Sequence, residues 1–149
     1  MSLSISAIHS AYTPYLTAAQ TASEAAYAPY SQFKVGAAVW TTDGQVITGV
    51  NVENASYGLS HCAERTALFT AVAQGLKSKL AGISLWANDV QQQHGQKYLG
   101  AATPCGACRQ VMSELLPPEA PVVFVHPSNG QAVQTTVSQL LPGAFTLSS

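Results

Sequence analysis

The sequence has 149 residues, which is enough for one domain that spans residues 1–149 and buries a core of its own. Hydrophobic residues make up 47% of the chain and charged residues 9%, a composition that excludes an intrinsically disordered protein. With 6 basic and 7 acidic residues, the net charge is −1, and the chain lacks the cations of a surface that binds a nucleic-acid backbone.

The first half of the chain predicts a helical segment followed by a hairpin. Residues 4–27 carry an alanine-rich helical pattern, in which Pro14 either kinks one helix or lies in the first turn of a second. Residues 28–31 contain a proline and end this segment. A buried strand is expected over residues 35–42, and the Asp43-Gly44 turn joins it to a returning strand at residues 45–50.

The second half alternates helices and strands. Helices are predicted over residues 62–75 and 105–116, strands over 81–87 and 121–125, and a polar loop over 88–102. A turn at 128–130, a short element at 133–136 and a short helix through Leu141 follow. Strands separated by helices should be parallel neighbours, so we expect an α/β fold: a three-layer α/β/α sandwich with a mixed sheet of about five strands.

Composition also bears on the compartment and on partners. No apolar run reaches the roughly 18 residues of a membrane-spanning helix, and residues 1–10 lack the basic start of a secretory signal. We therefore expect a cytoplasmic protein that binds neither membrane nor nucleic acid. The low charge content indicates that another subunit covers part of the apolar surface.

The three cysteines are better explained as metal ligands than as a disulfide framework, because their number is odd. Cys105 and Cys108 lie three residues apart at a helix start, which places both sulfur atoms on one face. A C-x-x-C pair alone is also typical of a redox pair or half a zinc finger, and buried free thiols are the alternative for Cys62. Three thiolates leave one position of a tetrahedral zinc open, which is the pattern of a catalytic site that lowers the pKa of water.

Charged residues follow the cysteines directly. Arg65 and Arg109 are expected to donate hydrogen bonds to the sulfur atoms, unless they are ordinary surface residues. Glu64 comes two residues after Cys62 and could transfer protons at the open position of the metal. The alternative for Glu64 is a purely electrostatic role at the helix N-terminus.

This combination resembles the cytidine deaminases of the small homotetrameric type, over about residues 24–146. The all-cysteine form of the zinc-deaminase signature is present in Cys62-Ala63-Glu64 and Pro104-Cys105-Gly106-Ala107-Cys108. The resemblance extends to residues 30–38, to the Asn51-Val52-Glu53-Asn54-Ala55-Ser56-Tyr57 loop, and to Leu140-Leu141-Pro142 with Phe145.

The resemblance implies hydrolytic deamination of cytidine and deoxycytidine to uridine and deoxyuridine, with release of ammonia, in pyrimidine salvage. It implies one zinc ion per subunit and a homotetramer with active sites at subunit interfaces. The implied site residues are the ligands Cys62, Cys105 and Cys108; the catalytic Glu64; Asn51 and Glu53 at the sugar 3′-OH; Phe33 in the base pocket; the backbone at Ala63 and at Thr103-Pro104 on the cytosine edge; and Tyr57 and Phe145 in a neighbouring subunit's site.

Several alternatives stay open at this point. Spacing alone is equally consistent with an Asx turn at Asn51, a solvated acid at Glu53 and a plain core role for Phe33. His61 is a possible but geometrically awkward rival ligand, Gly58 stands where a proline is common, and the long loop over 88–102 puts substrate preference in question. A deaminase of a modified or aminoacyl cytosine nucleoside, of the blasticidin type, and a non-catalytic structural zinc protein are the other functions considered.

Overall fold

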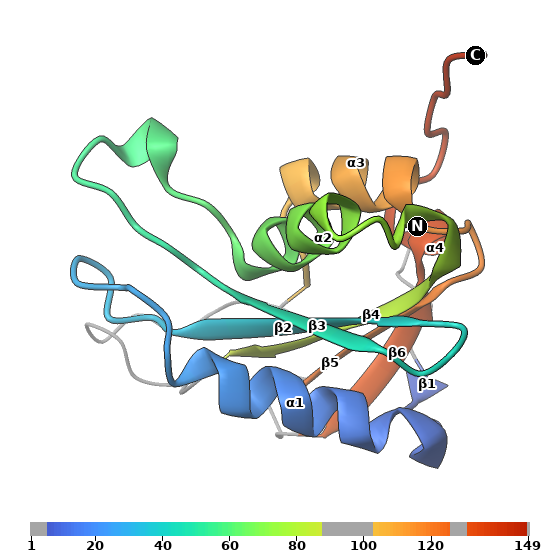
Figure 1. The fold of residues 1–149 in the computed structure, drawn as a ribbon, viewed down its shortest axis with the longest axis horizontal. Helices are drawn as coiled ribbons and strands as arrows, with labels where there is room; N and C mark the ends of the chain where they lie inside the picture. The colour runs from blue at the N-terminus through green and yellow to red at the C-terminus, as the bar shows by residue number, and fades with distance from the viewer. Residues whose placement is uncertain (1–5, 88–102, 126–130, 149) are drawn as a thin grey trace.

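The computed structural model describes residues 6–87, 103–125 and 131–148, in which six strands form one mixed sheet. Helix α1, Thr13–Ser23, covers one face of the sheet (Figure 1). Helices α2, Ala63–Ala73, α3, Gly106–Leu115, and α4, Val137–Leu140, lie on the other face. The expected three-layer α/β/α architecture is confirmed. Within the described part of the chain, no helix has the length and apolar character needed to cross a bilayer.

The sheet has the strand order β1-β6-β5-β4-β2-β3. Strands β4 and β5 are parallel, as predicted for two strands joined through a helix, and the other neighbouring pairs are antiparallel. The strand bounds are β1, Ser6–Ala7; β2, Val35–Thr41; β3, Val46–Val50; β4, Leu80–Ala87; β5, Pro121–Val125; and β6, Ala132–Thr136. The described residues also contain the short 3₁₀ helices η1, Ser10–Tyr12; η2, Tyr57–Leu59; and η3, Lys77–Lys79.

The N-terminal segment differs from its prediction. Within the helical pattern expected over residues 4–27, Ser6–Ala7 form β1, which pairs with β6 and makes a sixth strand instead of five. The regular helix α1 begins only at Thr13, and Pro14 lies in its first turn, where the missing N–H costs no hydrogen bond. The loop expected over 88–102 and the turn at 128–130 lie outside the described residues.

Side chains from both faces of the sheet are buried. Leu68 and Met112 pack with Phe124 between the sheet and helices α2 and α3, whereas Val123 faces α1 with Trp40. The Tyr15 ring stacks on Trp40 with centroids 4.2 Å apart and an interplanar angle of 6°. Strand β5 is therefore covered on both sides, as expected for a strand with a parallel neighbour.

A glycine makes room for this aromatic stack. Gly82 lies directly opposite Trp40 across β2 and β4, and a Cβ there would come within 2.2 Å of the indole ring. Gly82→Ala should lower the free energy of unfolding in urea by about 1–3 kcal/mol. Trp40→Leu should remove this effect, so the double variant is expected to be no less stable than Trp40→Leu alone. Simple additivity of the two substitutions would contradict the explanation.

Candidate active site

Three sulfur atoms from two helix starts converge at one point. Cys62 immediately precedes α2, Cys105 immediately precedes α3, and Cys108 lies in the first turn of α3. The Cys62 and Cys105 sulfur atoms are 3.9 Å apart, those of Cys105 and Cys108 are 3.5 Å apart, and all three lie within 4.8 Å of one another. This soft, compact donor set fits a zinc ion that keeps one coordination position for water or substrate.

The protonation of the thiols is consistent with a cation site. A hydrogen bond from the Cys108 thiol, together with the Arg65 guanidinium, lowers the pKa of Cys62 to about 5. The same pairing with Cys62, together with burial, raises the pKa of Cys108. One sulfur atom thus carries negative charge that a neighbouring S–H stabilises, and a metal cation would take the place of that proton.

Glu64 lies in the first turn of α2, next to the cysteine cluster, and its side chain is 6% exposed. Burial raises the pKa of this carboxyl to about 7. A carboxyl group with a pKa near neutrality can both accept and release a proton during a reaction. The helix N-terminus alone does not explain this burial, because a carboxylate that only complements the helix dipole would be more stable in water.

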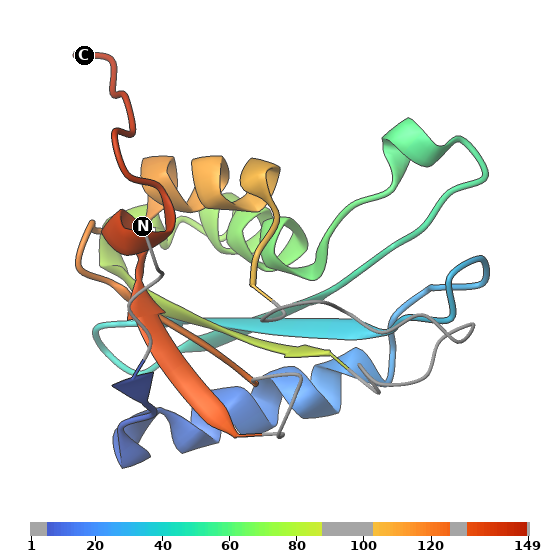
Figure 2. The ribbon, with the colours of Figure 1, turned by 180° about the vertical axis from the view of Figure 1, so that it is seen from behind.

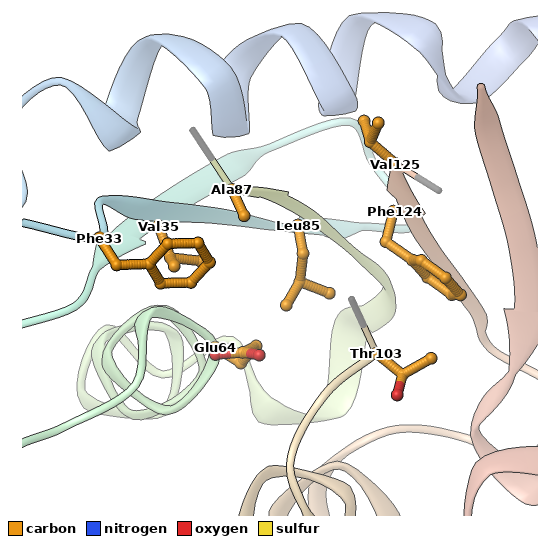
Figure 3. A pocket seen from close by; sticks show the side chains of 8 residues that line it. All are labelled: Phe33, Val35, Glu64, Leu85, Ala87, Thr103, Phe124 and Val125. Carbon is orange, nitrogen blue, oxygen red and sulfur yellow. The ribbon is translucent and has the colours of Figure 1, made fainter. Parts of the chain in front are cut away.

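A largely apolar cavity of about 130 Å³ opens beside Glu64 (Figure 3). Phe33 and Val35 line it at the start of β2, and Thr103 lines it just before α3. The remaining lining residues are at the carboxyl ends of β4 and β5: Leu85, Ala87, Phe124 and Val125. The cavity therefore lies where the parallel pair of strands ends, a position at which α/β folds commonly bind ligands.

Asn51 and Glu53 follow β3 and bind the backbone of residues 30–35, just before and at the start of β2. The Asn51 carboxamide accepts from the Val35 amide at 2.8 Å and donates to the Phe33 carbonyl at 2.7 Å. Glu53 Oε1 accepts from the amides of Tyr30 and Ser31 at 3.0 and 3.1 Å. Neither the local Asx turn nor a solvated acid describes these bonds, because each reaches across 16 residues or more.

The two arginines have different partners. Arg65 donates from Nη2 to the Cys62 sulfur at 3.4 Å, as predicted. The expected bond from Arg109 to a sulfur atom is wrong, because the guanidinium donates to three oxygen atoms. These belong to the Pro104 carbonyl at 2.8 Å, the Leu140 carbonyl at 3.0 Å and the Thr103 hydroxyl at 2.8 Å. Arg109 therefore ties the residues before Cys105 to the end of α4.

The remaining expected site residues divide into a buried and an exposed group. Ala63 is fully buried at the start of α2, beside Glu64. Tyr57 is 80% exposed on the arm of residues 51–61, and Phe145 is 67% exposed in the C-terminal tail (Figure 2). Tyr57 and Glu53 help to line a second, open cavity of about 290 Å³. His61 does not join the metal-binding group found in the described residues, and its ring lies against Phe69.

Sequence comparison adds an independent line of evidence. Residues 10–124 match the family model of the cytidine and deoxycytidylate deaminase zinc-binding region. The chain belongs to this deaminase family. A cytidine deaminase of Halalkalibacterium halodurans is 50% identical over 125 residues, which cover 84% of this chain and 86% of that protein.

Structural comparison agrees with the family assignment. The solved cytidine deaminase of Burkholderia pseudomallei superimposes with a TM-score of 0.75 at 49% identity, covering 89% of this chain and 97% of that chain. The blasticidin-S deaminase of Bacillus cereus is more distant, with 31% identity over 116 residues that cover 75% of this chain and 76% of that protein. Proteins with both names are thus similar to this chain over most of its length, and the cytidine deaminases are the more similar of the two.

Sequence reasoning missed four residues of the cavity wall in this member of the deaminase family: Leu85, Ala87, Phe124 and Val125. In the sequence they are indistinguishable from other apolar residues of buried strands. A usable signal was available, because the last residues of two adjacent parallel strands meet at one edge of the sheet.

In the metal-free protein, the contribution of Glu64 to the free energy of unfolding should fall as the pH rises. Its pKa is about 7 in the fold and 4.5 as a reference, so the folded state binds the extra proton between these values. The contribution of Glu64 to the free energy of unfolding is therefore present below pH 4.5 and is lost as the pH rises through about 7.

The test measures the free energy of unfolding in urea for wild type and for Glu64→Gln, both kept metal-free with a chelator, and takes the difference between them. The difference is needed because Cys62 has the opposite shift and titrates in an overlapping range. Between about pH 5 and about pH 8, wild type should lose on the order of 3 kcal/mol relative to the variant. A difference that stays constant over this range would show that Glu64 does not bind the proton.

Proposed function

We propose that the protein catalyses the hydrolytic deamination of cytidine and deoxycytidine, which gives uridine or deoxyuridine and ammonia. The observation that carries this proposal is the buried, protonatable Glu64 beside the three clustered cysteines, at the wall of a cavity that also contains Phe33. The names of the similar proteins from Halalkalibacterium halodurans and Burkholderia pseudomallei support cytidine as the substrate.

Zinc held by Cys62, Cys105 and Cys108, one ion per subunit, would supply the Lewis acidity that lowers the pKa of water. Glu64 accepts a proton from the attacking water and delivers it to N3 of the cytosine ring while oxygen bonds to C4. Glu64 then takes the proton of the new C4 hydroxyl and transfers it to the amino group, so that the C4 carbonyl forms, the C4–N bond breaks, and ammonia leaves. The balance is one water consumed and one ammonia released for each cytidine.

The other residues bind and orient the nucleoside. Phe33 offers an aromatic wall to the base, and the backbone at Ala63 and at residues 103–104 faces the cytosine edge. Asn51 and Glu53 bind the sugar 3′-OH with the hydrogen-bonding capacity that their backbone contacts leave free. Arg65 partly neutralises the thiolate charge through its bond to Cys62.

The test is to incubate the purified, zinc-loaded protein with cytidine and to quantify uridine and ammonia. Equal amounts of both products, formed at a rate proportional to enzyme, are the expected result. Turnover of blasticidin S in preference to cytidine would favour the modified-nucleoside alternative. Bound zinc without turnover of either compound would favour a structural zinc protein, and both outcomes would overturn the proposal.

We also propose that the protein is a homotetramer whose active sites lie at subunit interfaces. Support comes from large apolar side chains on the projecting arm and tail, where Tyr57, Leu59 and Phe145 are 80%, 65% and 67% exposed. A neighbouring subunit that packs against the arm or the tail would remove this apolar surface from water. Light scattering should give a mass about four times the 15.5 kDa of the chain. A monomer at micromolar concentration would contradict this expectation.

The cellular role that we propose is pyrimidine salvage in the cytoplasm. Reduced cysteines are required for a thiolate metal site, and a reducing compartment provides them. Conversion of cytosine nucleosides to uracil nucleosides returns them to a form that other enzymes of salvage can use. Accumulation of cytidine in cells that lack the protein, reversed by wild type but not by an inactive variant, is the expected result.

A further inference from the structure

Asn51 occupies a special position at the end of the hairpin ladder. The last regular pair between β2 and β3 joins Gly36 and Val50, so Val35 and Asn51 come next. The Asn51 amide donates to the Val35 carbonyl at 3.2 Å, as in a continuing ladder. The Asn51 main-chain carbonyl, however, has turned away to accept from the Tyr27 amide at 3.1 Å.

The Asn51 side chain replaces the bond that the ladder would otherwise lose. Its Oδ1 accepts from the Val35 amide at 2.8 Å, and its Nδ2 donates to the Phe33 carbonyl at 2.7 Å. Only one orientation of the carboxamide satisfies both partners, because the Val35 N–H must meet an acceptor and the Phe33 carbonyl must meet a donor. The side chain thus fixes the backbone on both sides of Lys34.

Gln32 and Phe33 lie just before β2 begins at Val35. Gln32, just before Phe33, has a φ of 56°, a left-handed conformation that costs energy for a residue with a side chain. The Phe33 amide donates to the Ser31 hydroxyl at 3.0 Å, so the segment leading to Phe33 is not paired as a strand. Phe33 and Val35 line the cavity beside Glu64, together with residues of β4 and β5 (Figure 3).

We propose that Asn51 is a positioning residue that sets the cavity wall at Phe33 and Val35, in addition to binding the sugar. This inference rests on the proposed function for its consequence in turnover. The carboxamide has two N–H groups and an oxygen with two lone pairs, so the two backbone bonds leave one donor and one lone pair for a sugar hydroxyl. One side chain would thereby connect the sugar end of the site to the base pocket.

The first measurement is hydrogen exchange, which does not depend on turnover. Asn51→Ala should speed exchange of the Val35 amide by roughly an order of magnitude or more, because that N–H loses its acceptor. Asn54→Ala is the matched control: it removes the same side chain from the same loop, and the Asn54 Oδ1 accepts only locally, from the Ser56 amide at 2.9 Å. This control should leave exchange at Val35 as slow as in wild type.

The second measurement separates positioning from sugar binding. A residue that acts only on the sugar hydroxyl is irrelevant for 2′,3′-dideoxycytidine, which lacks that group. If Asn51 also positions the wall, Asn51→Ala should lower kcat/KM for this substrate about tenfold to a hundredfold. Asn51→Asp keeps an acceptor for the Val35 amide but has no hydrogen for the Phe33 carbonyl, so slow exchange should return while turnover stays below wild type.

Two results would overturn the inference. One is exchange at Val35 that remains as slow in Asn51→Ala as in wild type, and the other is unchanged turnover of dideoxycytidine by that variant. If wild type fails to deaminate cytidine, the proposed function falls, whereas the exchange experiment still decides whether Asn51 holds the backbone.

Discussion

Replacing Glu64 with glutamine should lower kcat for cytidine by about two to four orders of magnitude. Glutamine has nearly the same shape and keeps a hydrogen-bonding carbonyl, so the first turn of α2 should stay intact. The amide cannot take up and return a proton near neutral pH, which is the property that burial gives to the Glu64 carboxyl. Steady-state kinetics on the purified variant, with metal content measured by elemental analysis, test the expectation.

Metal content distinguishes this explanation from simple damage to the site. Glu64→Gln should retain one zinc ion per subunit, because the three sulfur ligands are unchanged. Glu24→Gln, at an exposed position at the end of α1, is a matched control that should keep both zinc and activity. A zinc-loaded Glu64→Gln protein with near wild-type kcat would show that another group transfers the proton.

The second large effect is expected at Gly49, in β3. A Cβ at this position would lie 2.3 Å from the Ala67 nitrogen and 2.7 Å from the Ala63 carbonyl oxygen, both in the backbone of α2. Gly49→Ala should therefore push away the helix that begins at the Cys62 ligand and contains Glu64. We expect a loss of about 1–3 kcal/mol or more in stability, and a fall of roughly a hundredfold in kcat in the folded fraction.

Gly36 provides the control on the opposite face of the sheet. A Cβ at Gly36 would lie 1.9 Å from the Ala19 carbonyl oxygen, in the backbone of α1, which contributes no residue to the cavity. Gly36→Ala should destabilise the fold comparably, but its folded fraction at low temperature should keep zinc, because α1 carries no cysteine. Equal loss of zinc in the two variants would mean that the position of α2 has no special importance for the metal site.

Much of the fold is encoded locally and could be predicted. The Asp43-Gly44 turn and the buried runs of β4 and β5 each depend mainly on their own residues. Strand β1 could not be predicted in this way, because Ser6 and Ala7 are strand residues only through their partners Gln134 and Val133, more than a hundred residues away. Tertiary pairing overrides local pattern in such a short element.

In the candidate site, too, the features encoded locally could be predicted and those that depend on the tertiary fold could not. The cysteines and Glu64 could be found from spacing, because two helix starts carry them. The partners of Arg109 could not, because one of them is the Leu140 carbonyl at the end of α4, whose place depends on the whole sheet. The backbone bonds of Asn51 were equally hidden, since they exist only where β3 leaves the ladder.

The cysteine cluster should affect how long the protein persists in the cell as well as its chemistry. Cys62 and Cys105 are separated by 43 positions in sequence, with β4 between them, yet their sulfur atoms are 3.9 Å apart. An ion held by both, and by Cys108, would act as a crosslink that closes this loop and restricts the unfolded chain. Scarcity of zinc would then expose the chain to proteases as well as reduce its activity, so the cellular abundance of the protein should follow the zinc supply.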